Sequence, residues 1–81
     1  MSSFGPVSWQ ALGHYQQQIH YASTTVIYYG LAAPGVSTAS ASWQIRKEIL
    51  DSQGRTTSIT FANGTSDYTA IWDNRETYTY S

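Results

Sequence analysis

The chain has 81 residues, a formal net charge of -1 and no cysteine. A chain of this length forms one small domain that hides only about 60% of the surface exposed by its unfolded state. Without cysteine the chain cannot form disulfides or thiolate metal sites. We therefore expect it to gain stability by oligomerising or by binding a partner. Nucleic-acid partners are not expected, because they require clustered Lys and Arg and the chain has only 4 such residues.

Formal charge is confined to one part of the sequence. Every charged residue lies between Arg46 and Glu76, so residues 1–45 carry none. An ordinary exposed surface is roughly a quarter charged or more, whereas the cores of protein interfaces are poor in charge and rich in Tyr and Trp. We interpret residues 1–45 as a region that meets other protein. A polar, uncharged surface that faces water is the alternative.

The sequence predicts no membrane partner. No stretch approaches the roughly 20 apolar residues that a membrane helix needs. The start, Met1-Ser2-Ser3, lacks the basic residues of a secretory signal, and no long apolar run follows it. We expect synthesis in the cytosol, followed by a soluble existence or entry into an assembly.

The beginning of the chain admits two interpretations. A short helix would place Leu12, Tyr15 and Ile19 on one face at spacings of three and four. An extended arm would instead alternate Tyr15, Gln17, Ile19 and Tyr21. We favour the arm over residues 1–20, because the glutamine run leads towards a strand without a helix stop signal.

The remaining residues, 21–81, predict an all-β domain of four or five short strands. Residues 21–32 form a β-branched and aromatic run. Residues 42–50 and 57–61 alternate apolar and polar side chains, as does the end of the chain at residues 77–80. The expected architecture is a small antiparallel sheet, barrel or sandwich with an extended N-terminal arm.

Local residues predict the turns and two irregular positions. Pro34-Gly35 is typical of a type II turn, and Asn63-Gly64 of a type I′ connection. Gly54 is expected to set the register of the hairpin between them. Gly30 permits a bulge or the close approach of another backbone, and Lys47 interrupts an apolar face, which indicates a strand end or an edge.

The sequence offers no catalytic constellation. His14 and His20 lie six residues apart without an acidic neighbour, whereas a helical metal pair would favour a spacing of four. We interpret Asp67 and Asp73 as turn caps, and no phosphate loop or nucleophile elbow occurs. We therefore expect no enzyme activity, no catalytic residue, no cofactor and no metal.

The aromatic residues suggest core and contact roles. Trp43 and Trp72 are interpreted as core, with a sugar-binding platform formed with the tyrosines as the alternative. Trp9 lies in the uncharged arm, which a thin local core cannot bury, so it is a candidate partner contact. Arg75 offers a bidentate fork to a carboxylate on a neighbour, or a weak local ion pair with Asp73. The predicted partner-binding residues are Trp9, Tyr15, Ile19, Tyr21 and Arg75.

Three segments in this order resemble a known group of proteins. They are the Tyr/Gly/Ala-Pro-Gly opening of residues 28–35, the Trp-Gln-Ile strand within residues 40–47, and the Trp-Asp-Asn-Arg motif of residues 71–75, closed by residues 79–81. The chain resembles, over residues 28–81, a group of small proteins encoded in tailed-bacteriophage genomes.

The resemblance implies a structural protein of the virion, such as a capsid decoration or cement protein or a neck or tail component. It would bind other virion proteins and copies of itself, and removal of residues 1–20 is expected to abolish attachment but leave the β domain folded. A carbohydrate-binding module at a host-recognition tip and a small cytosolic inhibitor of a host enzyme are the alternatives.

Overall fold

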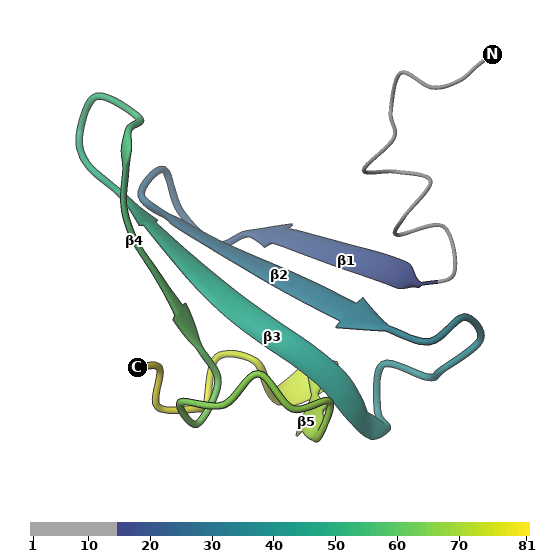
Figure 1. The fold of residues 1–81 in the computed structure, drawn as a ribbon. Coiled ribbons are helices and arrows are strands. Elements are labelled where there is room, and N and C mark those ends of the chain that lie inside the picture. The colour runs from purple at the N-terminus through teal and green to yellow at the C-terminus, as the bar shows by residue number, and fades with distance from the viewer. Residues whose placement is uncertain (1–14) are drawn as a thin grey trace, which may run out of the picture.

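The computed structural model describes residues 15–81, which form one antiparallel sheet (Figure 1). The strands are β1 (Gln16–Tyr21), β2 (Val26–Ala32), β3 (Ala41–Leu50), β4 (Thr56–Phe61) and β5 (Ala70–Ile71), followed by the 3-10 helix η1 (Trp72–Asn74). These residues contain no α-helix, which confirms the predicted all-β class. Of the expected architectures, the chain adopts the open sheet and not a barrel or a sandwich.

Strand β3 is the centre of the sheet. The order is β1-β2-β3-β4, and the short β5 also pairs with β3. β4 pairs with β3 from Arg46 to Leu50, and β5 pairs with the beginning of β3 at Ala41 and Trp43. The ten residues of β3 therefore carry two separate partners along one edge and β2 along the other.

Strand β1 begins inside the segment that was expected to be an arm. Gln16 faces Ala32 and the pairing with β2 runs without interruption to Tyr21. Residues 16–20 are extended, as their alternation predicted, but they belong to the sheet. Deletion of residues 1–20 would therefore remove nearly all of β1, and the domain would lose an edge strand.

The turns follow from local sequence. Gly35 has a φ of 82° and the Val36 amide donates to the Ala33 carbonyl, which confirms the type II turn. Asn63 and Gly64 have φ values of 57° and 69°, so both central residues of this turn adopt the left-handed conformation that a type I′ turn requires. These turns fix where the neighbouring segments begin.

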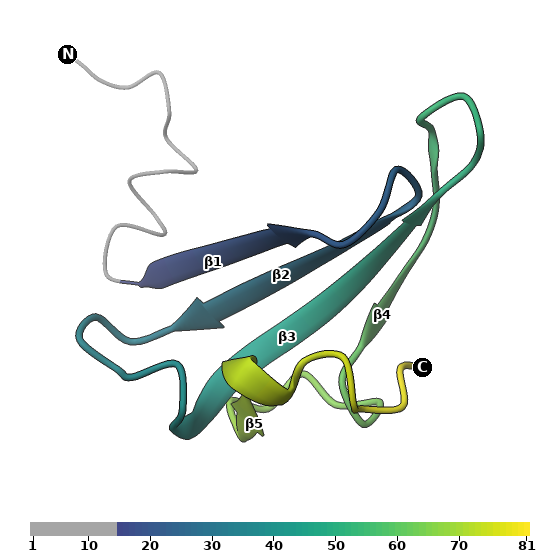
Figure 2. The same cartoon turned by 180° about the vertical axis from the view of Figure 1, so that it is seen from behind.

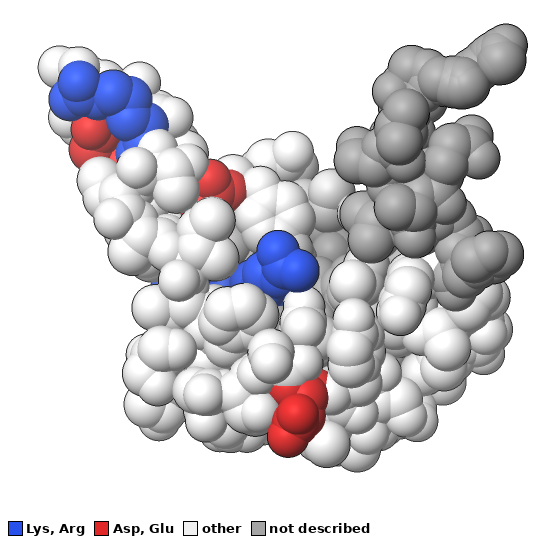
Figure 3. All heavy atoms as spheres, in the orientation of Figure 1, with Lys and Arg blue, Asp and Glu red and all other residues white. Residues whose placement is uncertain are grey.

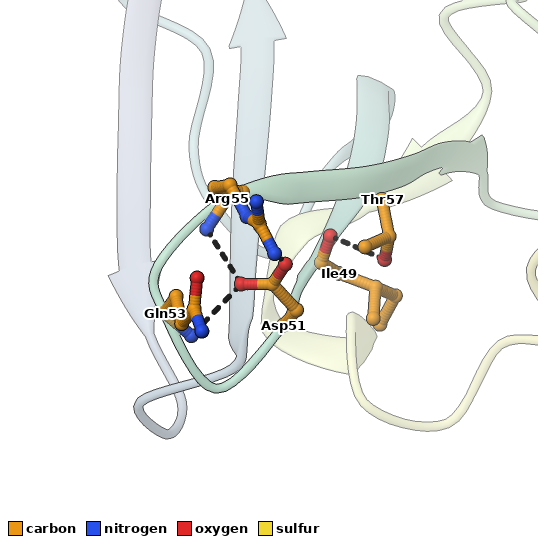
Figure 4. A network of polar contacts seen from close by, with 5 residues as sticks. All are labelled: Ile49, Asp51, Gln53, Arg55 and Thr57. Atoms are coloured by element: carbon orange, nitrogen blue, oxygen red, sulfur yellow. Dashed lines mark hydrogen bonds and ion pairs between the residues drawn. The ribbon is translucent and has the colours of Figure 1, made fainter.

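The tip of the β3–β4 hairpin is held by one carboxylate (Figure 4). Asp51 Oδ1 accepts hydrogen bonds from the backbone N–H groups of Gln53, at 2.8 Å, and Arg55, at 3.0 Å. The Arg55 guanidinium also donates to Asp51 Oδ2 at 2.9 Å. The Arg55 and Gln53 amides hold the pKa of the Asp51 carboxyl below its usual range. The charged groups of Asp51 and Arg55 therefore bind each other and the backbone of the turn.

One face of the sheet is covered by the C-terminal segment, residues 72–81, which crosses β3 when the molecule is seen from behind (Figure 2). Here the rings of Trp43 and Trp72 have centroids 6.0 Å apart. Both indoles are buried, as the core interpretation predicted. Among residues 15–81, the buried apolar residues are Tyr28, Ala32, Trp43, Ile45, Ala62, Ala70 and Trp72.

Gly30 lets the C-terminal segment approach the sheet closely. A Cβ atom at Gly30 would lie 2.5 Å from Cε3 of Trp72 and 3.1 Å from Cε3 of Trp43. Real Cβ contacts are not this short, so any side chain would push the indole of Trp72 away. The close approach predicted at Gly30 is made by a ring, not by another backbone.

Lys47 lies on this same covered face, in the middle of the sheet. Its Nζ atom is 6.0 Å from the ring centroid of Tyr28 and 5.6 Å from that of Tyr80. The predicted strand end or edge at Lys47 is wrong, because β3 has partners on both sides there. The cation is accommodated by its aliphatic stem and by attraction to the two aromatic faces.

The C-terminal segment also pairs with one end of the outer edge of β4. Phe61 of β4 exchanges backbone hydrogen bonds with Ser81 in both directions, each at 3.2 Å. Of the strand expected over residues 77–80, only a single bridge forms, between Ala62 and Tyr80. The outer edge of β4 is thus paired at its end by the chain's own C-terminus.

Candidate functional site: the open face of the sheet

The face opposite the C-terminal segment, here called the open face, is defined by the strand register. Side chains alternate between faces along each strand, so paired residues share a face. The open face consists of Gln17, Ile19 and Tyr21 from β1, Ile27, Tyr29 and Leu31 from β2, Gln44, Arg46 and Glu48 from β3, and Ile59 and Phe61 from β4.

The large apolar side chains that are exposed in residues 15–81 gather on this side. Ile19, Tyr21 and Ile59 lie on the open face with 48%, 71% and 53% of their surface exposed. Tyr15 continues the alternation of β1, and its ring stacks on that of Tyr68 at a centroid distance of 6.0 Å. Figure 3, which views this side, shows few charged atoms outside the hairpin tip. The exposed aromatic and aliphatic residues of β1 and β4 thus flank a polar row on β3, formed by Gln44, Arg46 and Glu48.

Arg46 is the only Lys or Arg of the open face, and its guanidinium is held in place. Its Nε and Nη2 atoms both donate to Gln44 Oε1 at 3.1 Å. The guanidinium lies 5.6 Å from the ring centroid of Phe61. Gln44 is buried and donates from Nε2 to the Ser66 carbonyl at 2.8 Å. Because this chain of contacts is fixed, Arg46 presents an ordered donor group beside apolar neighbours.

Glu48 is the acidic residue of the open face and is paired in a similar way. Tyr29 donates its hydroxyl proton to Glu48 Oε1 at 2.6 Å, and the Thr56 hydroxyl donates to Oε2. The hydrogen bonds from Thr56 and Tyr29 lower the pKa of the Glu48 carboxyl. The bond to Glu48, followed by desolvation, raises the pKa of Tyr29 to about 12. Tyr29 is therefore a neutral donor at physiological pH.

A shallow hollow of about 120 Å³ lies on the open face between β1, β2 and β3. Its lining combines apolar and polar residues, namely Gln17, Tyr29, Gly30, Leu31, Gln44 and Arg46. Its size suits one side chain or one small polar ring. Apolar walls with a few fixed polar groups are typical of binding sites.

Three of the predicted partner-binding residues lie together on this surface. Tyr15, Ile19 and Tyr21 are all on the side of the open face. Trp9 lies outside the described residues.

Arg75 is separated from the other predicted residues, because it lies on the covered side. Its Nε donates to His20 Nδ1 at 3.0 Å, and Nη1 donates to the Trp72 carbonyl at 3.1 Å. The guanidinium also stacks over the Trp72 ring at 4.7 Å. Arg75 thus joins the C-terminal segment to β1 within the chain, through Nε and Nη1 of its guanidinium.

Sequence reasoning missed Ile59, Tyr68 and the pair formed by Gln44 and Arg46. The alternation of its strand identifies Ile59 as an apolar position. The face on which Ile59 lies depends on its pairing with Glu48, and a register shift between Ile49 and Leu50 separates that pair from the hairpin turn. Single-residue alternation cannot reveal such a shift.

Residues 15–81 contain no group of three or more His, Asp or Glu side chains placed to hold a metal ion. None of the described helices is long and apolar enough to cross a membrane. No protein-family model, curated protein or solved structure matches the chain.

Proposed function

We propose that the chain is a structural protein of a bacteriophage virion, a capsid decoration, cement, neck or tail component that binds other virion proteins through its open face. The motifs at residues 28–35, 40–47 and 71–75 suggest the phage context. The single observation that carries the binding role is the gathering of the exposed large apolar side chains on one uncovered sheet face.

The chemistry of the open face suits a protein partner. Ile19 and Tyr21 of β1 adjoin Ile27 of β2 on the open face, and exposed apolar patches of this kind mark sites of protein contact. Tyr and Arg, which are enriched in the energetically important parts of interfaces, are both present at Tyr21, Tyr29 and Arg46. Burial against a neighbour would add to the small core that a chain of this length can build on its own.

Two neighbouring residues of β4 provide a matched test. Ile59 and Ser58 are both exposed, yet they point to opposite faces of the same strand. A phage that lacks the gene would be complemented with wild type, Ile59→Lys or Ser58→Lys, and the chain in purified particles would be quantified by mass spectrometry. The two substitutions add the same charge at adjacent positions.

We expect the wild type and Ser58→Lys to be present in particles at a fixed ratio to the major capsid protein. Ile59→Lys should be depleted by at least about 10-fold, equivalent to roughly 1.4 kcal/mol of binding free energy, because it places an ammonium in an apolar contact. Particles that lack the wild-type chain would refute the virion role. Equal incorporation of the two variants would refute the open face as the contact.

A second candidate function, carbohydrate binding at a host-recognition structure, has one observation in its favour. The exposed tyrosines Tyr15, Tyr21 and Tyr68 lie on the same side as the hollow, where Gln17 and Arg46 offer hydrogen-bond donors. Aromatic faces beside amides are suited to sugar rings. Calorimetric titration with host surface glycans, repeated with Arg46→Ala, would test it; absence of heat with all glycans would exclude it.

A further inference from the structure

The two outer edges of the sheet differ. The edge of β4 is paired near its end with the C-terminal residue Ser81. The outer edge of β1 pairs with no segment of residues 15–81 (Figure 1). An unpaired strand edge presents a row of backbone donors and acceptors that can bind another strand.

The register shows which backbone groups of β1 point outwards. Facing residues in an antiparallel pair alternate between pairs that exchange two hydrogen bonds and pairs that exchange none. The Ala22 amide donates to the Val26 carbonyl at 3.0 Å, just beyond the facing pair Tyr21 and Ile27. Tyr21 and Ile27 therefore exchange no backbone hydrogen bonds. By alternation, the same holds for Ile19 and Gln17 and their partners on β2. Their N–H and C=O groups point away from β2.

Strand β1 lacks the features that usually protect an edge. Protective devices include Lys, inward charges, Pro and bulges. The sequence Gln-Gln-Gln-Ile-His-Tyr contains no Lys, Arg, Asp, Glu or Pro, and its pairing with β2 has no register shift. A charged residue at the centre of the strand would oppose antiparallel pairing with an identical strand, since it would face the same charge on the second copy. β1 carries no such residue.

We propose that β1 pairs antiparallel with β1 of a second copy of the chain, with Ile19 facing Ile19 across a two-fold axis. This deepens the proposed function, since it names the chain itself as one partner in the assembly. In this register Gln17 faces Tyr21 of the second copy. All three outward-pointing residues of each strand then meet outward-pointing residues, and each facing pair exchanges two backbone hydrogen bonds.

The symmetric register also determines how the two copies are arranged. A shift of the second β1 strand by one residue is excluded. It would place residues whose backbone groups point outwards opposite residues whose groups point to β2, and it would put the open faces of the two copies on opposite sides. In the proposed register the two open faces lie on the same side, and the apolar residues of β1 and β2 from both copies adjoin. Ser81 pairs with the far edge only at Phe61, whereas a two-fold β1 interface is closed in itself and favours a dimer over a fibre.

Single cysteines test the register in the full-length chain, which has no native cysteine. Facing Cα atoms of a hydrogen-bonded pair lie about 5.5 Å apart, within the range that a disulfide spans. Two copies of Gln17 would be four residues apart, roughly 13 Å along the strand, which no disulfide spans. Ile19→Cys should form a covalent dimer on mild oxidation, Gln17→Cys alone should not, and Gln17→Cys combined with Tyr21→Cys should.

A second pair of variants tests the edge without cysteine chemistry. Ile19→Pro removes an outward N–H but no hydrogen bond to β2, and Pro is tolerated at such edge positions. Ile19→Val keeps the N–H and serves as the matched control. By sedimentation, wild type and Ile19→Val should have twice the 9.0 kDa chain mass. Ile19→Pro should have the monomer mass and an unchanged far-ultraviolet circular dichroism spectrum.

The outcomes separate this inference from the proposed function. A monomeric wild type, or equal cross-linking of Ile19→Cys and Gln17→Cys, would overturn the β1 pairing even if the chain were found in particles. Conversely, a dimer that is cross-linked only in the predicted register supports the pairing even if particles lack the chain. If Ile19→Pro lost its β-sheet spectrum, the cysteine series would decide.

Discussion

The two faces of the sheet carry similar aromatic and aliphatic residues but are completed in different ways. On the covered face, the indole of Trp72 lies on Gly30 and against Trp43, and the C-terminal segment excludes water. On the open face, Ile19 and Tyr21 project into solvent. The C-terminal segment therefore covers one face and pairs with one end of the β4 edge, whereas the open face is left without a cover from residues 15–81.

The largest difference between the faces is expected in stability. Trp72→Ala removes the main cover of the core and should lower the free energy of unfolding by about 3–5 kcal/mol. Tyr21→Ala, on the open face, should change it by less than about 0.5 kcal/mol, because 71% of the Tyr21 surface is already exposed. Urea unfolding followed by circular dichroism measures both. Similar losses in the two variants would contradict the division into a structural and a free face.

A smaller effect is expected at the contact that allows the cover to form. Gly30→Ala should destabilise the chain by about 1–3 kcal/mol, because the new methyl group overlaps the ring of Trp72. In a Trp72→Leu background the overlapping ring atoms are absent, so the same substitution should cost less. A double-mutant cycle measures this coupling. Additive losses would mean that the ring of Trp72 is not the obstacle.

The smallest effect concerns the polar pair of the open face and depends on pH. The pKa of Tyr29 is raised from 10.0 to about 12 in the folded chain by its bond to Glu48. The folded state therefore binds the proton more tightly, so this contribution to stability is complete below pH 10 and is lost as the pH rises towards about 12. Between pH 10 and about 12, the free energy of unfolding should fall less for Tyr29→Phe than for the wild type, because Phe has no proton to lose.

The same urea midpoints, measured at neutral pH and through the alkaline window, check this expectation. Tyr80, whose pKa is raised mainly by burial on the covered face, provides a comparison on the other side of the sheet. Identical alkaline profiles for wild type and Tyr29→Phe would show that the bond to Glu48 does not hold the Tyr29 proton.

Local features of the fold could be predicted because they depend on neighbouring residues. The pairs Pro34-Gly35 and Asn63-Gly64 specify their turns through backbone conformations available to few residues. Alternation likewise identified most strands, although it did not place the boundary of β1 within the segment assigned to the arm.

Features that depend on distant residues could not be predicted in the same way. Gly30 is understood only when Trp72 is placed upon it, and Lys47 only when the rings of Tyr28 and Tyr80 are placed around its ammonium. The same limit applies to the open face. Tyr15, Ile19 and Tyr21 could be chosen from one strand, whereas Ile59 required the pairing of β4 with β3.

The most direct test of the central claim is hydroxyl-radical footprinting of the chain, free and in purified phage particles. Tyr21 and Ile59 of the open face are exposed in the isolated chain, whereas Trp72 of the covered face is already buried. We predict that assembly strongly reduces oxidation of Tyr21 and Ile59 and leaves the low oxidation of Trp72 unchanged. Tyr21 and Ile59 that remain as reactive in the particle as in the free chain would contradict the claim that the open face is where a partner binds.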